Sequence, residues 1–424
     1  MLSIKNEILQ GSYDDCFKTL YSSVASAQKR YADSVDEFEK LFGTKQFVSL
    51  FSAPGRTEVG GNHTDHQHGC VLAGSVNLDV IAVASPNADG IVRIKSQGYD
   101  MDTVSLNKLD VVIDEYGHAV SLIRGMLAQM KANGYKIGGF DAYTTSNVLK
   151  GSGLSSSAAF EVLIGVIISN LFNDGKASAV EIAKMAQKAE NIYFGKPCGL
   201  MDQMASSVGG FTAIDFKNPK EPIIEKVNFD LAAHGYSLCI INTGGNHANL
   251  TDDYAAITSE IRTVANFFEC EVLRDVSENE FFENIKELRE KCGDRAVLRA
   301  LHFFADNKRA IDEKNALKDN DFLQFLSLVN ESGNSSYKYL QNVFSVSAPS
   351  EQGVALALAI SEKVLTGRGA HRVHGGGFAG TIQCFVPNDI LEDYLSAMKA
   401  VFGDQSCYVL NIRPVGGTAV TKNK

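Results

Sequence analysis

Apolar residues recur with helical spacing in three stretches of the first 175 positions. Residues 13–42 carry apolar side chains at intervals of three and four, which predicts a helix with one buried face, and Gly43 supplies its stop. Residues 119–133 also predict a helix. Residues 158–172 are apolar nearly all round and follow a run of serines, so they predict a buried helix that begins at those serines.

Two shorter helices are predicted next, and the second half of the chain is rich in helix. The sequence Ser-Ala-Val-Glu at 178–181 fits a capping box and predicts a helix that ends near Gly195. Pro197 is expected to open another helix, stopped by Gly209-Gly210, because proline is tolerated at the first helical position. The stretch 253–365 favours helix throughout.

Extended segments lie between these helices. Residues 47–52 predict a strand that Pro54-Gly55 ends, and residues 71–84 and 91–95, joined by a turn at 86–90, predict a strand–turn–strand unit. Further strands are expected at 140–146, 211–216, 237–242, 372–386 (two strands around a glycine loop) and 408–412. This mixed order predicts an α+β fold in two lobes, which we place at residues 1–215 and 216–424.

Composition narrows the class of protein. The 424 residues are 45% hydrophobic and 21% charged, which rules out large-scale disorder. A formal charge of −10 argues against a general nucleic-acid binder. The eight cysteines form no CxxC pair, and the longest apolar runs, such as 162–168, are too short to span a membrane. We therefore expect a cytoplasmic protein with reduced thiols, no membrane partner, and a monomeric or weakly oligomeric state.

The segment 55–69 is dense in glycine and in hydrogen-bonding side chains. Arg56, His63 and Asp65 together supply the donors and acceptors that sugar hydroxyls need. Two other interpretations stay open: a zinc site, in which His66 and His68 join His63 and Asp65, and a polar surface loop.

A serine-rich glycine turn precedes the buried helix. It consists of Gly151, Ser152, Gly153, Leu154, Ser155, Ser156 and Ser157, followed by Ala158. It is neither a Walker loop nor a complete dinucleotide fingerprint, yet glycines and free N–H groups at a helix start favour phosphate binding. A plain serine cap on a buried helix is the alternative.

Two more segments carry candidate chemistry. Asp202 lies among apolar and small residues at 198–204, preceded by Glu190, so burial would suit it to act as a base or a ligand. The loop 374–380 holds four glycines between two expected strands, which indicates close packing against a backbone or a ligand.

In this order the segments resemble the galactokinase branch of the GHMP small-molecule kinases. Residues 55–69 look like the galactokinase signature, 151–159 like the ATP loop, 198–203 like the stretch with the catalytic aspartate, and 375–380 like the third glycine motif. The resemblance implies two lobes, the C-terminal one ferredoxin-like, with the site between them. It also implies an ATP-dependent sugar 1-kinase that uses Mg²⁺, with galactose as the expected sugar.

The resemblance also implies roles for single residues. Asp202 would be the catalytic carboxylate and Arg56 its cationic partner, while Glu190 and Ser156 or Ser157 (we favour Ser157) would bind magnesium. The sugar-contacting positions would be Asn62, His63, Asp65, Gly199, Asp202 and Tyr254. The residues of the turn 151–158 would bind the nucleotide.

Three positions depart from the family pattern. Asn62 replaces a glutamate, His66 replaces a tyrosine, and Ile257-Thr258 stand where a pair of arginines is expected. Asn62 keeps an acceptor but loses the charge, which keeps open a kinase for another monosaccharide, such as N-acetylgalactosamine or arabinose. A non-catalytic sugar and ATP sensor and a zinc-dependent hydrolase are the alternatives from other classes.

Overall fold

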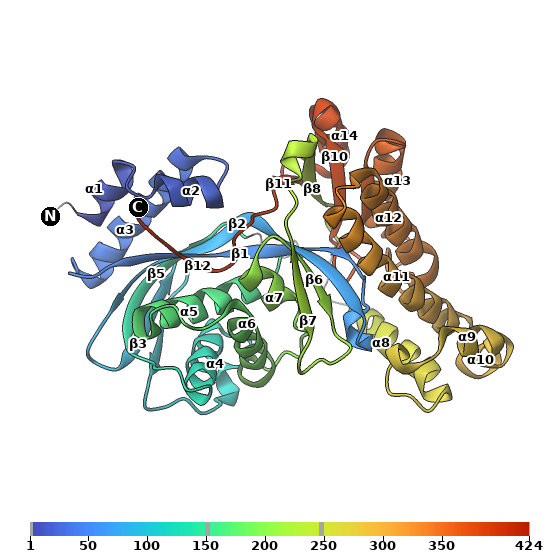
Figure 1. Ribbon diagram of the computed structural model, residues 1–424, viewed down its shortest axis with the longest axis horizontal. Coiled ribbons are helices and arrows are strands. Elements are labelled where there is room, and N and C mark those ends of the chain that lie inside the picture. Colours follow the sequence, from blue (N-terminus) through green and yellow to red (C-terminus); the bar gives the residue numbers. More distant parts are fainter. Residues whose placement is uncertain (1–2, 149–152, 246–249, 424) are drawn as a thin grey trace.

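The computed structural model describes residues 3–148, 153–245 and 250–423. Its larger sheet has the order β12-β1-β2-β5-β3-β4, while β6 pairs with β2 and β7 pairs with β6 (Figure 1). The strands are β1 (Ser49–Gly60), β2 (Cys70–Pro86), β3 (Ile91–Ser96), β4 (Met101–Ser105), β5 (Phe140–Ser146), β6 (Phe211–Asp215), β7 (Ile223–Val227) and β12 (Thr418–Val420). Only the β3–β5 pair in this sheet is parallel among the described strands.

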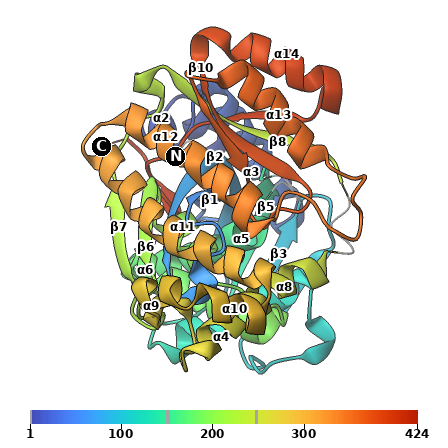
Figure 2. The ribbon, with the colours of Figure 1, turned by 90° about the vertical axis from the view of Figure 1, so that its right-hand side faces the viewer.

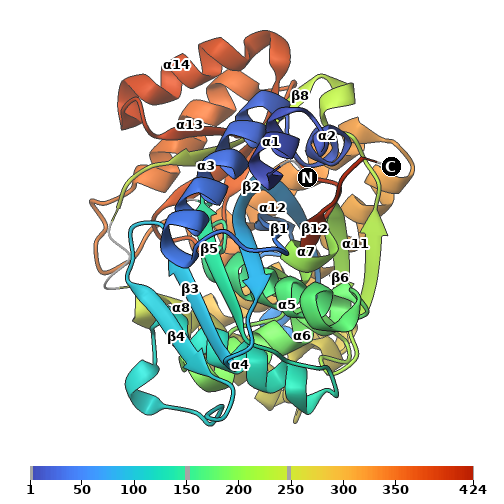
Figure 3. The same ribbon diagram turned by 90° about the vertical axis from the view of Figure 1, so that its left-hand side faces the viewer.

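Both faces of the larger sheet are covered because successive strand residues point to opposite sides. Leu50 packs with the N-terminal helices α1 (Ile4–Leu9), α2 (Asp14–Leu20) and α3 (Val24–Phe42), whereas its neighbour Phe51 belongs to the core on the other face. Figure 3 looks onto the first side, where α3 lies beside β2 and β5. The opposite face carries α4 (Ala119–Ala132), α5 (Ser156–Asn173), α6 (Ala179–Lys188) and α7 (Met201–Val208).

Helix α5 is the buried helix that its composition predicts. It is long and apolar enough to cross a membrane by length and composition alone, but 61% of it is buried inside the protein. It packs against β1, β2 and the neighbouring helices α4, α6 and α7. Its role is therefore that of a core helix, and it carries the serine-rich turn at its N-terminal end.

The second half of the chain builds an antiparallel sheet of order β11-β8-β10-β9. Its strands are β8 (Tyr236–Asn242), β9 (Ala370–Val373), β10 (Thr381–Pro387) and β11 (Cys407–Leu410). Its helices are α8 (Thr251–Phe267), α9 (Glu278–Glu283), α10 (Ile285–Cys292), α11 (Asp294–Lys318), α12 (Phe322–Ser335), α13 (Gly353–Leu365) and α14 (Leu391–Phe402). In Figure 2 the long helices α11 and α12 cross in front of β1 and β2.

Short helical turns complete the fold. They are η1 (Asp65–Gln67), η2 (Ile113–Glu115), η3 (Ala189–Phe194), η4 (Ala232–His234), η5 (Leu273–Asp275), η6 (Ser336–Leu340) and η7 (Asn388–Ile390), of which η3 and η6 are π-helical. Isolated π-helical turns occur frequently at functional sites. The turn η3 contains Glu190 and continues α6, whose start is the predicted capping box of Ser178 and Glu181.

The strands β2 and β3 form the predicted strand–turn–strand unit, although they do not pair, since β5 lies between them. Three local predictions are wrong, and each failure has a physical cause. Residues 13–42 form two helices rather than one, because Tyr21 is extended and Ser23 caps a new start. Pro54 does not end its strand, because a register shift before Arg56 carries β1 onward to residue 60. The helix expected at Pro197 begins only at residue 201.

The two halves of the chain interlock. The strands β7 and β12 lie beyond residue 215 in sequence but hydrogen-bond within the larger sheet. One apolar core contains residues from both sheets, among them Phe211 and Phe385. The chain ends meet as well, because the Asn423 N–H donates to the Ser12 carbonyl at 2.7 Å. The division at 215/216 stays a prediction.

Candidate active site

An arginine–aspartate pair joins β1 to the start of α7. The Arg56 Nε and Nη2 atoms both lie 2.6 Å from Oδ1 of Asp202. The remaining Nη1 of Arg56 donates to the carbonyl of Gly153, and the Arg56 N–H donates to the carbonyl of Leu154 at 3.1 Å. The resemblance implies that Asp202 is the catalytic carboxylate. Arg56 therefore holds this carboxylate in a fixed position relative to the serine-rich turn.

The carboxylate of Asp202 is held in its ionised form. Burial raises its pKa, but the charge of Arg56 and a hydrogen bond from the Ser155 hydroxyl outweigh burial and hold the pKa below its ordinary value. Asp202 also lies in the first turn of α7, where the helix dipole favours a negative charge. About a third of the side chain (31%) is exposed, so the anion stays accessible.

The serine-rich turn presents a helix N-terminus to the same place. Ser155 caps α5 in a left-handed conformation with φ 53°, and the helix begins at Ser156. The first N–H groups of a helix have no partner within it, and an anion is the ligand they favour. Leu154 and Ala158 are buried and anchor the turn. The other two predicted nucleotide-binding residues, Gly151 and Ser152, lie outside the described part of the chain.

Glu190 and Ser157 are neighbours, as the predicted metal pair requires. The Ser157 hydroxyl donates to Oε1 of Glu190 at 3.2 Å, and the Gln203 amide donates to Oε2 at 2.7 Å. The same Gln203 amide lies 3.1 Å from Glu161, which burial and the charge of Glu190 give a pKa well above the ordinary value.

Two buried oxygens in this cluster lack a hydrogen-bond partner. They are Oε1 of Glu161 and Oε1 of Gln203. Together with Glu190 and Ser157, the cluster presents hard oxygen donors, which is the ligand type that Mg²⁺ prefers. The residues present therefore fit a magnesium ion, which Glu190 and Ser157 would hold.

Four of the predicted sugar-contacting residues lie in two groups, Gly199 with Asp65 and His63 with Tyr254. The backbone of Gly199 comes so close to Asp65 that a Cβ atom at 199 would lie 2.6 Å from Oδ2 of Asp65. His63 and Tyr254 instead contact the glycine loop, with His63 Nε2 3.0 Å from the Gly376 carbonyl. Burial lowers the pKa of His63 to about 4, so its imidazole is neutral.

Tyr254 contacts the same loop from the C-terminal half. Its hydroxyl donates to the Gly377 carbonyl at 3.1 Å, and its ring lies 5.5 Å from that of Phe378. The glycine loop also packs against backbone, as its composition predicts, because a Cβ atom at Gly377 would lie 2.1 Å from the Asn342 carbonyl oxygen.

Asn62 is buried, and its amide makes every hydrogen bond that it can. Its two N–H groups donate to Glu58 Oε1 at 2.7 Å and to the Gly375 carbonyl at 2.9 Å. Its Oδ1 accepts from Asn342 at 2.8 Å and from Ser336 at 3.2 Å. An amide has two donors and two lone pairs, so none is left for a ligand in this arrangement. A sugar contact by Asn62 stays a prediction that requires at least one of these bonds to open.

The described residues contain no group of three or more His, Cys, Asp or Glu side chains arranged to hold a metal ion. His63 and His66 have ring centroids 6.0 Å apart, and His66 is exposed. The zinc interpretation of this segment therefore gains no support.

Several residues of the site were missed from the sequence. Glu161 had a visible signal, because it is the only charged residue in the stretch 156–173. Gln203 is the neighbour of Asp202, but nothing in the sequence shows that its amide lies between two carboxylates. Lys196, whose Nζ lies 3.1 Å from Glu190, had no signal at all.

Comparison with known folds identifies the class. Residues 36–86 match the galactokinase galactose-binding signature, and residues 121–210 match the N-terminal domain of GHMP kinases. A solved galactokinase of Lactococcus lactis, complexed with galactose, is 24% identical, with a TM-score of 0.77 over 92% of this chain and 99% of that one. A mevalonate kinase structure is 14% identical with a TM-score of 0.61, over 86% and 98%. The α+β, two-lobed fold is thus confirmed as that of the GHMP small-molecule kinases.

Sequence relatives narrow this class to one family. A galactokinase of Actinobacillus pleuropneumoniae is 31% identical over 366 residues, which cover 85% of this chain and 90% of the relative. A galactokinase of Streptomyces coelicolor is 28% identical over 348 residues, 82% and 86% of the two chains. The chain belongs to the galactokinase family and is a sugar phosphotransferase.

Proposed function

We propose that this enzyme transfers the γ-phosphoryl group of ATP to the anomeric hydroxyl of galactose. The observation that carries the proposal is the placement of Asp202. An ionised, partly exposed carboxylate lies between an arginine and the N-terminal turn of a buried helix. A base and an anion site side by side are what phosphorylation of a hydroxyl group requires.

The proposed reaction assigns a place to each atom. Asp202 accepts the proton of the anomeric hydroxyl while the sugar's C1 oxygen bonds to the γ-phosphorus. The bond from that phosphorus to the bridging β,γ-oxygen breaks, and the products are galactose 1-phosphate and ADP. Arg56 has two roles: it orients Asp202, and its charge stabilises the negative charge that develops on the sugar's C1 oxygen.

The nucleotide is assigned to the start of α5. The N–H groups that follow Ser155 and the hydroxyls of Ser156 and Ser157 would hold phosphate oxygens. Gly151 to Leu154 and Ala158 stay predicted nucleotide-binding residues. Ser157 and Glu190 would hold magnesium, which when bound neutralises phosphate charge.

The magnesium assignment has its own test. In Glu190→Gln the activity should depend more steeply on magnesium and recover in part at high metal, because one anionic ligand is lost. An unchanged magnesium response would make Glu190 a structural residue.

The sugar is assigned to the space around Asp202, with Asp65, Gly199, His63 and Tyr254 as contacts. The full hydrogen-bond set of Asn62 is the observation that keeps a second sugar in consideration. A kinase with a different set of sugar contacts, for N-acetylgalactosamine or arabinose, is compatible with an Asn62 amide that is already fully paired. We further propose that the enzyme acts in the cytoplasm on free sugar, as a monomer or weak homo-oligomer.

A substrate panel tests the proposal. ADP release should be fastest with galactose, compared with N-acetylgalactosamine, arabinose and a no-sugar control, and phosphorus NMR should show a 1-phosphate. A higher kcat/KM for another sugar would replace galactose as substrate. Binding of sugar and ATP without any ADP release would instead identify a non-catalytic sensor.

A further inference from the structure

Lys196 lies directly beside the predicted metal ligands. Its Nζ is 3.1 Å from Oε1 of Glu190, the same oxygen that accepts the Ser157 hydroxyl at 3.2 Å. The Glu190 side chain is almost fully buried, and the ion pairs of the described residues give it no other cationic partner. The ammonium therefore occupies part of the coordination space of the proposed magnesium ligand.

The backbone around Lys196 is fixed, whereas its side chain is not. Gly195 ends η3 in a left-handed conformation, and the N–H groups of Gly195 and Lys196 both donate to the Glu190 carbonyl. A Cβ atom at 195 would lie 2.4 Å from the Tyr116 ring, so this tight turn requires glycine. The Lys196 side chain is 60% exposed, and its tip can move while its base stays in place.

The charge of Lys196 also reaches the catalytic carboxylate. Burial lowers the pKa of Lys196, but Glu190 and Asp202 outweigh it, and the net pKa is raised, so the side chain is an ammonium. In return Lys196 is one of the groups that lower the pKa of Asp202. The amino group thus lies in the field of both acids that phosphoryl transfer would use.

We propose that Lys196 is a further cationic residue of the phosphate site: it neutralises Glu190 when no nucleotide is bound and contacts a phosphate oxygen once a divalent cation occupies Glu190. This inference rests on the proposed function. Magnesium binds oxygen at about 2.0–2.1 Å, and two cations cannot share one carboxylate oxygen at such distances without strong repulsion. A displaced ammonium on a flexible stem would stay near the start of α5, where the nucleotide brings negative charge.

The alternative is an ordinary surface ion pair, which contributes little to stability and nothing to catalysis. The two interpretations predict different effects of removing the Lys196 ammonium on metal binding and on nucleotide binding. If the ammonium competes for Glu190, its removal tightens metal binding in the absence of nucleotide and weakens nucleotide binding in the presence of metal. An ordinary surface ion pair predicts neither effect.

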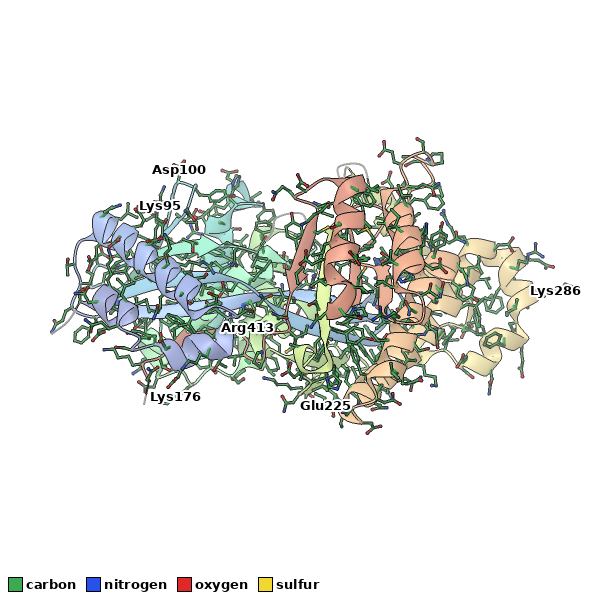
Figure 4. The ribbon with its side chains drawn as sticks, turned by 90° about the horizontal axis from the view of Figure 1, so that it is seen from above. Lys95, Asp100, Lys176, Glu225, Lys286 and Arg413 are labelled. Atoms are coloured by element: carbon green, nitrogen blue, oxygen red, sulfur yellow. The ribbon has the colours of Figure 1, made fainter. Side chains whose placement is uncertain are left out.

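The first measurement is Mn²⁺ binding to the nucleotide-free protein by electron paramagnetic resonance. Lys196→Met should bind Mn²⁺ about two- to fivefold more tightly, the range that one exposed ion pair supports. Lys196→Arg keeps the charge and should resemble the wild type. Lys176→Met removes a more exposed lysine (73%, against 60% for Lys196) that pairs with Asp174. Lys176 lies at the outer edge of the molecule (Figure 4), and its loss should leave the affinity unchanged.

The second measurement is MgADP binding by calorimetry, together with kcat/KM for ATP. Lys196→Met should weaken MgADP binding and lower kcat/KM for ATP, each by roughly 10- to 100-fold. This is the contribution of a hydrogen bond between charged groups. Lys196→Arg should recover most of the loss. If Lys196→Met matches the wild type in either measurement, the proposal is wrong. Binding of MgADP needs no sugar, so an enzyme that phosphorylates none of the panel sugars would sink the proposed function while the role of Lys196 is still decided.

Discussion

Asp79 and Asp202 are both paired with arginine, yet only one of them is available to a ligand. Asp79 in β2 is fully buried and accepts from Arg30 at 2.5 Å, Arg413 at 3.2 Å and the Tyr21 hydroxyl at 2.5 Å. These partners come from both ends of the chain. Asp202 has a single arginine, and a third of its side chain faces solvent.

The difference shows how one ion-pair type serves two purposes. Around Asp79 every neighbour is a donor from the protein, so the pair ties the N-terminal helices and the C-terminal segment to the sheet. Around Asp202, Arg56 and Ser155 hold the carboxylate from one side only, and the remaining surface can accept a proton from a substrate. A closed network stabilises the fold, and an open one can do chemistry.

The largest expected effect is that of Asp202→Asn on kcat, and it tests the contrast between Asp202 and Asp79 directly. This variant keeps the shape and removes the base, so kcat should fall by about 10²–10⁴, the usual contribution of a positioned base. The buried Arg56 loses its counter-charge, but about a third of the Asp202 side chain is exposed, so the free energy of unfolding should fall less than in Asp79→Asn. Steady-state ADP release and urea denaturation, measured on the same preparation, check both halves of this expectation.

Asp215→Asn is the matched control. Asp215 pairs with Arg274 at 2.9 Å and is exposed to a similar extent, 29%, but it lies outside the site. Its kcat should match the wild type. Near wild-type turnover of Asp202→Asn would refute the assignment of Asp202 as the base.

Asp79→Asn should have the opposite profile. The buried guanidinium of Arg413 and the partly buried one of Arg30 would lose their counter-charge, which costs about 3–5 kcal/mol of stability, while kcat of the folded fraction stays unchanged. The denaturation midpoint in urea measures the loss. Asp389→Asn, which breaks the exposed pair with Arg368, should cost less than about 1 kcal/mol. Equal losses in the two variants would contradict the view that the Asp79 network is structural.

The segments that carry the candidate site could be predicted from the sequence, and the closed network around Asp79 could not. Gly153 to Ser157 and Asp202 were found because a turn and a helix start place their chemistry within a few residues. Arg413 is 334 residues from Asp79, and no local pattern shows that two such residues meet. The same holds for β12, three residues long, which exists only because β1 offers an edge.

Asn62 shows the limit of a motif. The resemblance placed it among the sugar contacts, but its position alone did not reveal that Glu58, Ser336, Asn342 and the Gly375 carbonyl take up its amide. Three of these partners lie more than 270 residues away in sequence. Motif spacing predicts where a side chain starts, and tertiary packing decides what it touches.

The variant Asn62→Ala tests whether the Asn62 amide is structural or contacts the sugar. If the amide is structural, its loss leaves buried partners unpaired and lowers the free energy of unfolding by about 1–3 kcal/mol. If it contacts the sugar, KM for the sugar rises with stability intact. Urea denaturation and sugar titrations separate the two outcomes. Asn133→Ala, at an exposed helix end, serves as the control for removing an asparagine amide.

Ser155→Ala is the smallest and most specific test. Ser155 lowers the pKa of Asp202, so removing its hydroxyl raises that pKa. Activity requires the anion: it is present above the pKa of Asp202 and is lost as pH falls through it. The acidic limb of kcat/KM should therefore move to higher pH, while the loss at pH 7 should stay well below that of Asp202→Asn, because the carboxylate itself is kept. Ser156→Ala removes a neighbouring hydroxyl with no described bond to Asp202, so its acidic limb should not move. If the acidic limb shifts equally in Ser155→Ala and Ser156→Ala, the ionisation of Asp202 does not determine the acidic limb of kcat/KM.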